Sequence, residues 1–177
     1  VAVTIKMDGE NTSMYRDGLH ARSLDSRHHP SRSVIKSIHA VVKNNIPYGW
    51  RICGENMYAK HSIHYTDLES YFYVFSVWDA NNNCLPLDET LEFCEQRGLT
   101  HVPVIEKVSI ASPKDFWELQ MCYIDAVVSG QEGIVVRNVE GYHYDHFQQN
   151  LAKAVRKNHI QTDIHWSKEW IPNLLKS

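Results

Sequence analysis

The stretch that decides the fold is VTIKMDGENT, residues 3–12, close to the start of the chain. Its apolar run predicts a short strand that ends at Lys6, and Asp8 and Gly9 follow at once. On a strand, Lys6 and Asp8 point to the same face, and Gly9 lets the backbone turn or approach a ligand closely. A lysine at the end of a strand is usually a solvated edge residue. The question is whether Lys6 is instead a nucleophile held against a phosphate.

Nucleophilic use of a lysine requires a special environment. The amine attacks only in its neutral form, and its ordinary pKa is about 10.4. Burial and nearby cations such as Mg²⁺ or arginine lower that value and activate the amine. The pattern K-x-D-G, which begins at Lys6, is short enough to recur by chance. Whether Lys6 reacts is therefore decided by the partners that the rest of the chain supplies.

Length and composition are those of an ordinary globular chain. Of the 177 residues, 43% are hydrophobic and 22% are charged, which suits one domain with a sizeable core. The longest apolar stretch, 71–78, is far shorter than the roughly 20 residues that cross a bilayer, so no membrane association is expected. The chain lacks an initiator methionine and starts inside a predicted strand. We therefore expect a single domain over 1–177 whose N-terminus is incomplete.

The four cysteines form no C-x-x-C pair and show no zinc-binding spacing. This pattern predicts reduced thiols in an intracellular, cytoplasmic protein.

The net charge of −3 does not indicate a nucleic-acid-binding protein, but positive charge is concentrated in residues 16–36. Against two acidic side chains, this segment carries five basic ones: Arg16, Arg22, Arg27, Arg32 and Lys36. The cluster is either a solvated face or a track for phosphates on an otherwise acidic body. The adjacent His28 and His29 do not indicate a metal site, because neighbouring residues rarely point at one metal.

Hydrophobic periodicity and turn signals divide the chain into strands and helices. Strands are predicted over 1–6, 11–16, 19–23, 50–55, 70–79, 101–108 and 132–138, with 151–157 as a further candidate. A helix over 34–45 would be capped by Ser33, and a helix over 88–97 is ended by Gly98. A third helix starts at Ser112-Pro113, with a buried stripe of Phe116, Leu119, Tyr123, Ile124 and Val127.

A short amphipathic helical tail is expected to end at Asn173. Strands dominate the pattern, and the helices do not alternate with them in regular βαβ units. The predicted fold class is therefore α+β, with mainly antiparallel sheets and flanking helices.

Six segments, taken in order along the chain, resemble the motifs of the covalent nucleotidyltransferases, and within them an RNA ligase family. KMDGEN at 6–11 is similar to motif I, HARS at 20–23 to motif Ia, and YFYVFSVWD at 71–79 to motif III. CGENMY at 53–58 resembles the segment that supplies a ribose-binding glutamate, EGIVVRN at 132–138 resembles motif IV, and LAKAVRKNH at 151–159 resembles motif V. Most of these are weak alone, but their order and their spread over nearly the whole chain make the set specific. The resemblance implies a nucleotidyltransferase (adenylylation) domain.

The resemblance also implies roles for individual residues. Lys6 takes AMP from ATP as a phosphoamide, Lys153 neutralises charge on the α-phosphate, and Glu132 holds a divalent metal, Mg²⁺ or Mn²⁺. The residues expected to contact the nucleotide are Ile5, Asp8, Asn11, Arg22, Glu55, Phe75, Lys153 and Arg156. Those expected to bind phosphate or RNA are Arg27, Arg32 and Lys157. Motif V departs from the usual two lysines separated by one residue, so either Arg156 or Lys157 is a candidate for the second cation.

Several of these residues have a plainer alternative. Arg22 could be a surface arginine, although its planar guanidinium suits a phosphate or a terminal hydroxyl. Glu55 could pair with Arg51 on the same strand face. Phe75 could only fill the core rather than stack on adenine, and Tyr73 on the same face is then the fallback.

The function expected from this resemblance is ATP-dependent RNA ligation in three steps. Lys6 would form lysyl-AMP, AMP would pass to a 5′-phosphate, and a 3′-hydroxyl would then displace AMP and close the strand. The expected partners are ATP and RNA, including nicks in RNA/DNA duplexes, and the expected oligomeric state is a monomer. A DNA ligase or an mRNA-capping guanylyltransferase shares K-x-D-G and remains an alternative. A non-catalytic module that binds nucleic-acid ends is a second alternative.

Overall fold

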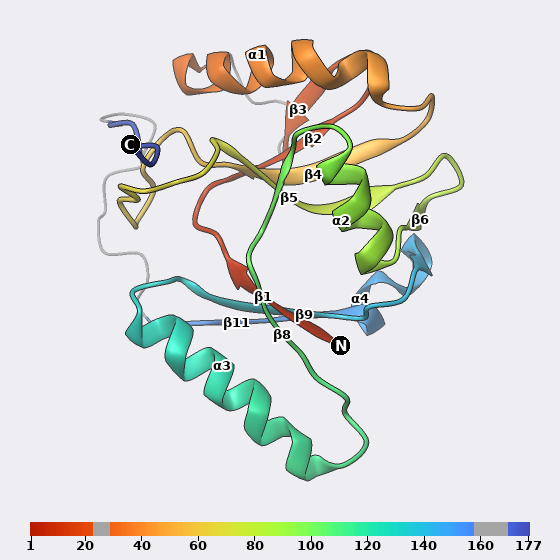
Figure 1. The fold of residues 1–177 in the computed structure, drawn as a ribbon, viewed down its shortest axis with the longest axis vertical. Coiled ribbons are helices and arrows are strands. Elements are labelled where there is room, and N and C mark those ends of the chain that lie inside the picture. Colours follow the sequence, from red (N-terminus) through yellow and green to blue (C-terminus); the bar gives the residue numbers. More distant parts are fainter. Residues whose placement is uncertain (23–28, 158–169) are drawn as a thin grey trace.

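The computed structural model describes residues 1–22, 29–157 and 170–177, and its layers are seen edge-on in Figure 1. From top to bottom the figure shows helix α1, a larger sheet, a smaller sheet and helix α3. Mixed helix and antiparallel sheet is the fold class predicted from the sequence, and the structure confirms it.

The small sheet has four strands in the order β11-β9-β1-β8, and every neighbouring pair is antiparallel. Its strands are β1 (Ala2–Lys6), β8 (Val104–Lys107), β9 (Gly133–Arg137) and β11 (Leu151–Val155). β1 therefore lies in the interior of this sheet, which explains why Ala2, Val3 and Thr4 are all buried. Lys6 is the last residue of the strand, as the opening stretch predicts.

The large sheet has seven strands, six of them in the order β10-β6-β5-β4-β2-β3. The seventh, β7, pairs with β5 in parallel, and the other neighbours are antiparallel. The strands are β2 (Glu10–Met14), β3 (Leu19–Ala21), β4 (Arg51–Asn56), β5 (Phe72–Trp78), β6 (Asn83–Cys84), β7 (Thr100–His101) and β10 (Tyr142–His143).

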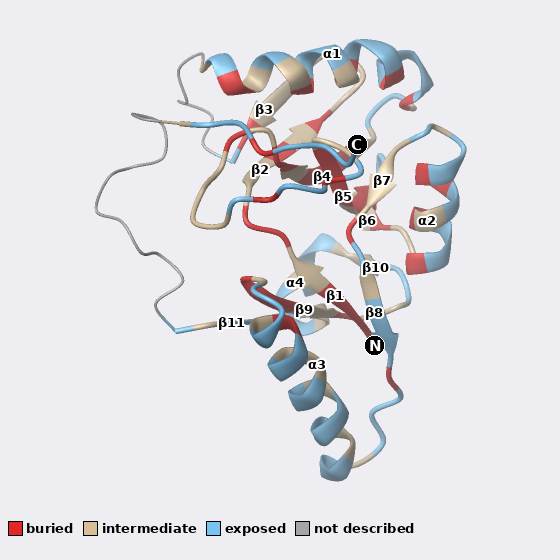
Figure 2. Cartoon of the chain, turned by 60° about the vertical axis from the view of Figure 1, so that its left-hand side comes forward, coloured by how far each residue is buried: buried red, intermediate tan, exposed pale blue. Residues whose placement is uncertain are grey.

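Helices α1 (Ser33–Val42) and α2 (Leu87–Glu95) pack against the large sheet, and α3 (Phe116–Val128) packs against the small sheet. The single-turn α4 (Phe147–Asn150) instead packs its Phe147 with Trp78 and Cys84 of the large sheet. Ile35 and Val42 of α1 pack with Met14 and Phe72 of the large sheet, whereas Ala126 of α3 packs in a separate cluster with the small sheet. In Figure 2 the buried residues gather in the strands, and most of α3 is exposed. Within the described part of the chain, no helix combines the length and apolarity that crossing a bilayer requires.

The strand predicted over 101–108 is divided in the structure. Thr100–His101 joins the large sheet as β7, and Val104–Lys107 joins the small sheet as β8. Pro103 lies at the division; it has no backbone N–H to continue a ladder, and its carbonyl accepts a hydrogen bond from the Ile5 N–H at 2.9 Å. This crossing carries the chain from one sheet to the other.

The buried stripe predicted for α3 is wrong in part. Phe116 is 56% exposed and Ile124 is 39% exposed, so neither belongs to the core. The residues that pack toward the small sheet are Leu119, Cys122, Tyr123 and Ala126. They are spaced at i, i+3, i+4 and i+7, which is an equally regular helical face turned toward the sheet.

Two further expectations are corrected. Ser33 is the first residue of α1 rather than its cap, because Pro30–Arg32 forms a 3-10 turn that leads directly into the helix. Residues 170–177 contain no helix; Pro172 and Leu175 form isolated bridges with Ala59 and Leu68. Asn173 is completely buried there and does not end a helical tail.

Candidate active site

A cavity of about 380 Å³ lies between the two sheets, within the roughly 300–1,000 Å³ typical of small-molecule sites. Seven of the residues predicted from the sequence line it: Ile5, Lys6, Asn11, Arg22, Glu55, Phe75 and Lys153. They come from both sheets and from segments as far apart as β1 and β11. The fold thus brings together side chains that are scattered along almost the whole sequence.

The register of the small sheet orders one wall of the cavity. Lys6 pairs with Gly133 on β9, and Val135 on β9 pairs with Lys153 on β11. Arg137, at the far end of β9, pairs with Leu151. Because alternate residues share a face, Val135 and Arg137 line the cavity together, and the rows of Lys6 and Arg137 lie about 13 Å apart along the strand. The site is therefore elongated, with Lys6 at one end and Arg137 at the other.

Lys6 forms an ion pair with Glu132, with 2.6 Å between Nζ and Oε2. Glu132 is only 4% exposed and immediately precedes β9. The same nitrogen would have to reach a phosphorus atom, so Lys6 can act as a nucleophile only once this contact is broken.

The position after Glu132 requires glycine. A Cβ at Gly133 would lie 2.0 Å from the carbonyl oxygen of Ala154 on the neighbouring strand, a distance that real Cβ atoms do not show. The backbone N–H of Arg156 donates to the Glu132 carbonyl at 2.9 Å, which ties the end of β11 to the same point. The close approach of β9 and β11 thus places the Glu132 carboxylate beside Lys6.

Glu55 is a carboxylate at the cavity wall with unused hydrogen-bonding capacity. Its Oε2 atom is buried, and it has no hydrogen-bond partner among the described residues. Burial is the main cause that raises the pKa of Glu55 to about 8; Lys6 lowers it, and the charges of Glu132, Asp8 and Glu10 raise it further. A carboxyl group keeps an acceptor oxygen in either protonation state, so Glu55 suits a ligand hydroxyl.

The structure does not show the alternative pairing of Glu55 with Arg51. The guanidinium of Arg51 lies over the Trp78 ring instead, with 4.6 Å between Cζ and the ring centroid.

The raised pKa of Glu55 predicts a pH-dependent cost in stability. The ordinary value is 4.5, so unfolded chains ionise first, and wild type loses stability as the pH rises from about 4.5 to about 8. We expect Glu55→Gln to unfold at higher urea concentrations than wild type at pH 8.5, by roughly 2–4 kcal/mol, and to differ much less at pH 4.5. Urea titrations of both proteins at the two pH values measure this. A stability difference that does not change with pH would contradict it.

Phe75, rather than Tyr73, presents its ring to the cavity. Phe75 is partly buried and lines the site, whereas Tyr73 is 5% exposed and its hydroxyl accepts the Glu69 N–H at 2.9 Å. Arg137 donates from Nη1 to the Phe75 carbonyl and so supports this part of β5.

Arg22 and Lys153 contribute cationic groups from opposite sides. The Arg22 N–H donates to the Asn11 carbonyl at 2.9 Å, which prolongs the β2–β3 pairing and leaves the Arg22 side chain exposed at the cavity. Lys153 is exposed on β11 and reaches the cavity from the small sheet. Arg156 and Lys157 do not line the cavity, so among the motif V cations the structure places Lys153 alone at this wall.

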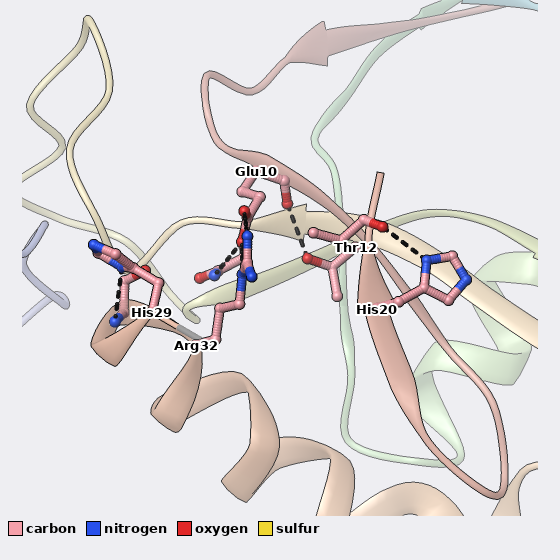
Figure 3. Close-up of polar contacts among 8 residues, drawn as sticks. Glu10, Thr12, His20, His29 and Arg32 are labelled. Atoms are coloured by element: carbon pink, nitrogen blue, oxygen red, sulfur yellow. Dashed lines mark hydrogen bonds and ion pairs between the residues drawn. The ribbon is translucent and has the colours of Figure 1, made fainter. Parts of the chain in front are cut away.

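Asp8 and Arg32 also lie away from the cavity lining. Asp8 is buried, and its Oδ2 accepts hydrogen bonds from the N–H groups of Ser62 and Ile63 at 2.7 and 2.8 Å. Figure 3 shows the guanidinium of Arg32 against the carboxylate of Glu10, and Nε donates to Oε2 at 2.8 Å. That hydrogen bond raises the pKa of Arg32. Arg27 lies outside the described residues.

Arg137 is the cavity residue that sequence reasoning missed. It is 3% exposed, its Nη2 donates to the Leu85 carbonyl at 3.4 Å, and Nε has no partner among the described residues. In the part of the chain that the structure describes, no carboxylate forms a salt bridge with it. A signal was present in GIVVR at 133–137, because strand alternation puts Val135 and Arg137 on one face.

The RNA ligase family matches residues 1–155 of this chain. No curated protein sequence matches it. Among solved structures, Naegleria gruberi RNA ligase with PPi is similar at a TM-score of 0.57 and 19% identity, over 87% of this chain and 48% of that one. An archaeal ATP-dependent RNA ligase is similar at a TM-score of 0.57 and 18% identity, over 87% and 42%.

A protein described as an ATP-dependent DNA ligase from Aquifex aeolicus is similar at a TM-score of 0.58 and 20% identity, over 87% of this chain and 43% of that one. At these identities the likeness concerns the fold. The chain spans less than half the length of each of these solved structures.

Proposed function

This chain belongs to the RNA ligase family, and from that premise we propose that it is one adenylyltransferase domain that activates RNA ends through a lysyl-AMP intermediate on Lys6. One observation carries the proposal: Lys6, Glu55, Phe75 and Lys153 all line one elongated cavity. A reactive amine, a hydroxyl acceptor, an aromatic ring and a cation are the groups that a nucleoside triphosphate needs along its length. Solved Naegleria gruberi RNA ligase mutants, one with AMP and Mn and one with ATP and Mn, support ATP and a divalent metal as ligands of this fold.

In the proposed first step, the lone pair of neutral Lys6 Nζ forms a bond to the α-phosphorus of ATP. The bond from that phosphorus to the bridging oxygen breaks, pyrophosphate leaves with the electron pair, and the nitrogen releases a proton to solvent. Lys153 and Arg22 lie at the cavity wall where they can offset the charge that develops on the phosphate oxygens. Glu55 would accept a ribose hydroxyl, and Phe75 would stack on the base.

In the second step, a 5′-phosphate oxygen of RNA attacks the same phosphorus, and the bond to Lys6 Nζ breaks as the amine takes back a proton. In the third step, a 3′-hydroxyl oxygen attacks the phosphorus of the 5′-phosphate and releases its proton to solvent, while the bond from that phosphorus to the oxygen of AMP breaks and AMP leaves with the electron pair. Arg22 is exposed at the cavity and would meet a nucleic-acid phosphate there.

The residues present fit a divalent cation that is held mainly by the nucleotide. The described residues contain no group of three or more acidic, histidine or cysteine side chains that would bind a metal alone. Mg²⁺ in phosphoryl-transfer sites usually keeps several waters and takes one or two carboxylates plus substrate phosphates. Glu132 would supply such a carboxylate. The cation, when bound, supplies charge neutralisation at the phosphates.

The test is the mass of the intact protein after incubation with ATP and Mg²⁺. We expect an AMP adduct that forms with ATP and not with GTP, which separates this activity from that of a capping guanylyltransferase. Supplying 5′-phosphorylated RNA, nicked RNA/DNA duplex or nicked DNA then identifies the strands that discharge the adduct. DNA ends are the competing substrate, because the fold is also similar to that of the protein described as an ATP-dependent DNA ligase from Aquifex aeolicus. A protein that never acquires AMP would instead support the non-catalytic end-binding module.

Replacing Phe75 with leucine should weaken ATP binding more than it weakens the fold. Stacking of a base on an aromatic ring is worth roughly 1–3 kcal/mol, so the ATP concentration for half-maximal adduct formation should rise about 5- to 100-fold. Adduct formation over a series of ATP concentrations, with thermal melting in parallel, measures both effects. Tyr73→Leu is the matched control. Because Tyr73 packs in the core, its replacement should lower the melting temperature more than Phe75→Leu does. A large loss of stability in Phe75→Leu with unchanged ATP dependence would mean that Phe75 only fills the core.

A further inference from the structure

The described C-terminal residues 170–177, here called the C-terminal strap, lie along the connection between β4 and β5, residues 57–71. In Figure 1 the dark blue strap runs beside this yellow connection. Hydrogen bonds between backbone groups join the two segments. The N–H of Asn173 donates to the Tyr58 carbonyl at 2.8 Å, that of Leu174 to the Tyr65 carbonyl at 2.9 Å, and that of Lys176 to the Leu68 carbonyl at 2.8 Å. The connection has no helix or strand of its own, so the strap supplies much of its backbone pairing.

Asn173 is the centre of this contact. It is 0% exposed, and its amide reaches three points of the connection. Nδ2 donates to the Met57 carbonyl at 2.7 Å and to the Ala59 carbonyl at 3.4 Å, and Oδ1 accepts the Tyr65 N–H at 2.9 Å. A buried amide with both ends satisfied defines one conformation of the groups around it.

The same connection holds Asp8, two residues after Lys6. The Asp8 N–H donates to the Tyr65 hydroxyl at 3.2 Å. The Asp8 carboxylate accepts the Ser62 and Ile63 N–H groups. Met7 packs in one cluster with Tyr65 and with Met57, which is the residue whose carbonyl Asn173 binds. A continuous set of buried contacts therefore runs from Asn173 through Tyr65 to the backbone beside Lys6.

We propose that Asn173 is a positioning residue for Lys6, which it holds in place through the 57–71 connection and Asp8. The proposal rests on the proposed function, because it concerns the amine that takes AMP. Attack on phosphorus requires the amine to be in line with the leaving group, and a misplacement of about 1 Å can cost 100-fold in rate. Asn173 does not line the cavity, so its effect falls on the rate of reaction more than on nucleotide binding.

Three variants of the full chain test this. Asn173→Ala removes the amide, and Tyr65→Phe removes the acceptor of the Asp8 N–H without touching the strap. Tyr71→Phe is the matched control, because it also deletes one hydroxyl. That hydroxyl donates to the backbone carbonyl of Asn173 and makes no hydrogen bond with Asp8. In single-turnover adduct formation we expect the first two variants to react about 10- to 100-fold more slowly at saturating ATP, with a smaller change in half-saturating ATP. Tyr71→Phe should stay near the wild-type rate.

Hydrogen exchange gives a readout that does not depend on activity. In Asn173→Ala the amides of Ser62 and Ile63, which Asp8 protects, should exchange faster than in wild type, although neither contacts Asn173 directly. If Asn173→Ala does not fold, Tyr65→Phe decides the question through its rate. Wild-type rates in both variants, or unchanged exchange at Ser62 and Ile63, would overturn the proposal. If wild type itself forms no adduct, the proposed function fails, and the exchange data still decide whether Asn173 holds the partners of Asp8.

Discussion

Lys6→Arg is expected to fold normally and to form no AMP adduct. Arginine keeps a cation opposite the buried Glu132, so the ion pair that Lys6 makes survives in a related form. The guanidinium stays protonated in proteins and cannot attack phosphorus. Lys6→Ala should lose the adduct too, but it also leaves the Glu132 carboxylate without its lysine partner and should lower stability. Intact mass after incubation with ATP and Mg²⁺ measures the adduct. Thermal melting shows whether a variant lacks the adduct because it lacks the nucleophile or because it is less stable.

The control for this experiment is Lys107→Ala. Lys107 pairs with Asp88 at 2.7 Å, and both side chains are largely exposed, so its loss should change neither folding nor adduct formation by much. Pre-adenylylated RNA provides a second control, because its sealing does not require a lysyl-AMP intermediate. Lys6→Arg should retain part of that sealing activity. An adduct that persists in Lys6→Arg, on a different lysine, would refute the assignment of the nucleophile.

Glu132→Gln is expected to reduce adduct formation at least about 100-fold at ordinary Mg²⁺. A divalent cation at transferring phosphates is worth several kcal/mol, and each 1.4 kcal/mol is a factor of ten in rate. The amide keeps the size of the side chain and can still accept a hydrogen bond from Lys6, so the fold should survive. Adduct formation over a series of Mg²⁺ and Mn²⁺ concentrations, with melting temperatures, measures the effect.

The same variant distinguishes two roles of Glu132, because they predict opposite changes in the rate of adduct formation. If Glu132 only pairs with Lys6, its replacement by glutamine weakens the contact that holds the Lys6 amine away from a phosphate. Adduct formation would then be unchanged or faster. If Glu132 also holds the cation, the rate falls at every pH, and high Mn²⁺ restores part of it. A faster Glu132→Gln would remove the metal role.

Local patterns predicted most of the secondary structure, because they report which residues can lie on a strand or a helix. The run 70–79 is apolar on both faces, and β5 is indeed buried on both sides within the large sheet. Gly98 ends the second helix region with φ of +62°, a conformation that glycine adopts without strain. The division at Pro103 was visible as a proline inside a predicted strand, but the sequence does not say that the two halves join different sheets.

The cavity itself was only partly predictable. Six of the seven predicted residues that line it belong to segments that resemble family motifs, and the seventh, Ile5, directly precedes the first of these segments. Asp8 belongs to the same kind of segment, yet it serves the 57–71 connection, because the turn after β1 directs its carboxylate to the Ser62 and Ile63 amides. Arg137 was overlooked because a cation at the end of an apolar strand is usually solvated. Its burial depends on β5 and on the segment around Leu85, which are distant in sequence.

The sequence by itself determined the order of the longer strands and of helices α1, α2 and α3, the position of Lys6 at the end of β1, and membership in a family through residues 1–155. The short elements β6, β10 and α4 were not predicted. Only the tertiary structure decided that Lys6 meets Glu132, which side of α3 faces the small sheet, and that Asn173 is buried beside the connection that holds Asp8. The physical reason is the range of the interactions. Strand and helix patterns arise between residues a few positions apart. The contacts that Lys6 makes with Glu132, and Asn173 with Met57, join residues more than a hundred positions apart, and only tertiary packing brings them together.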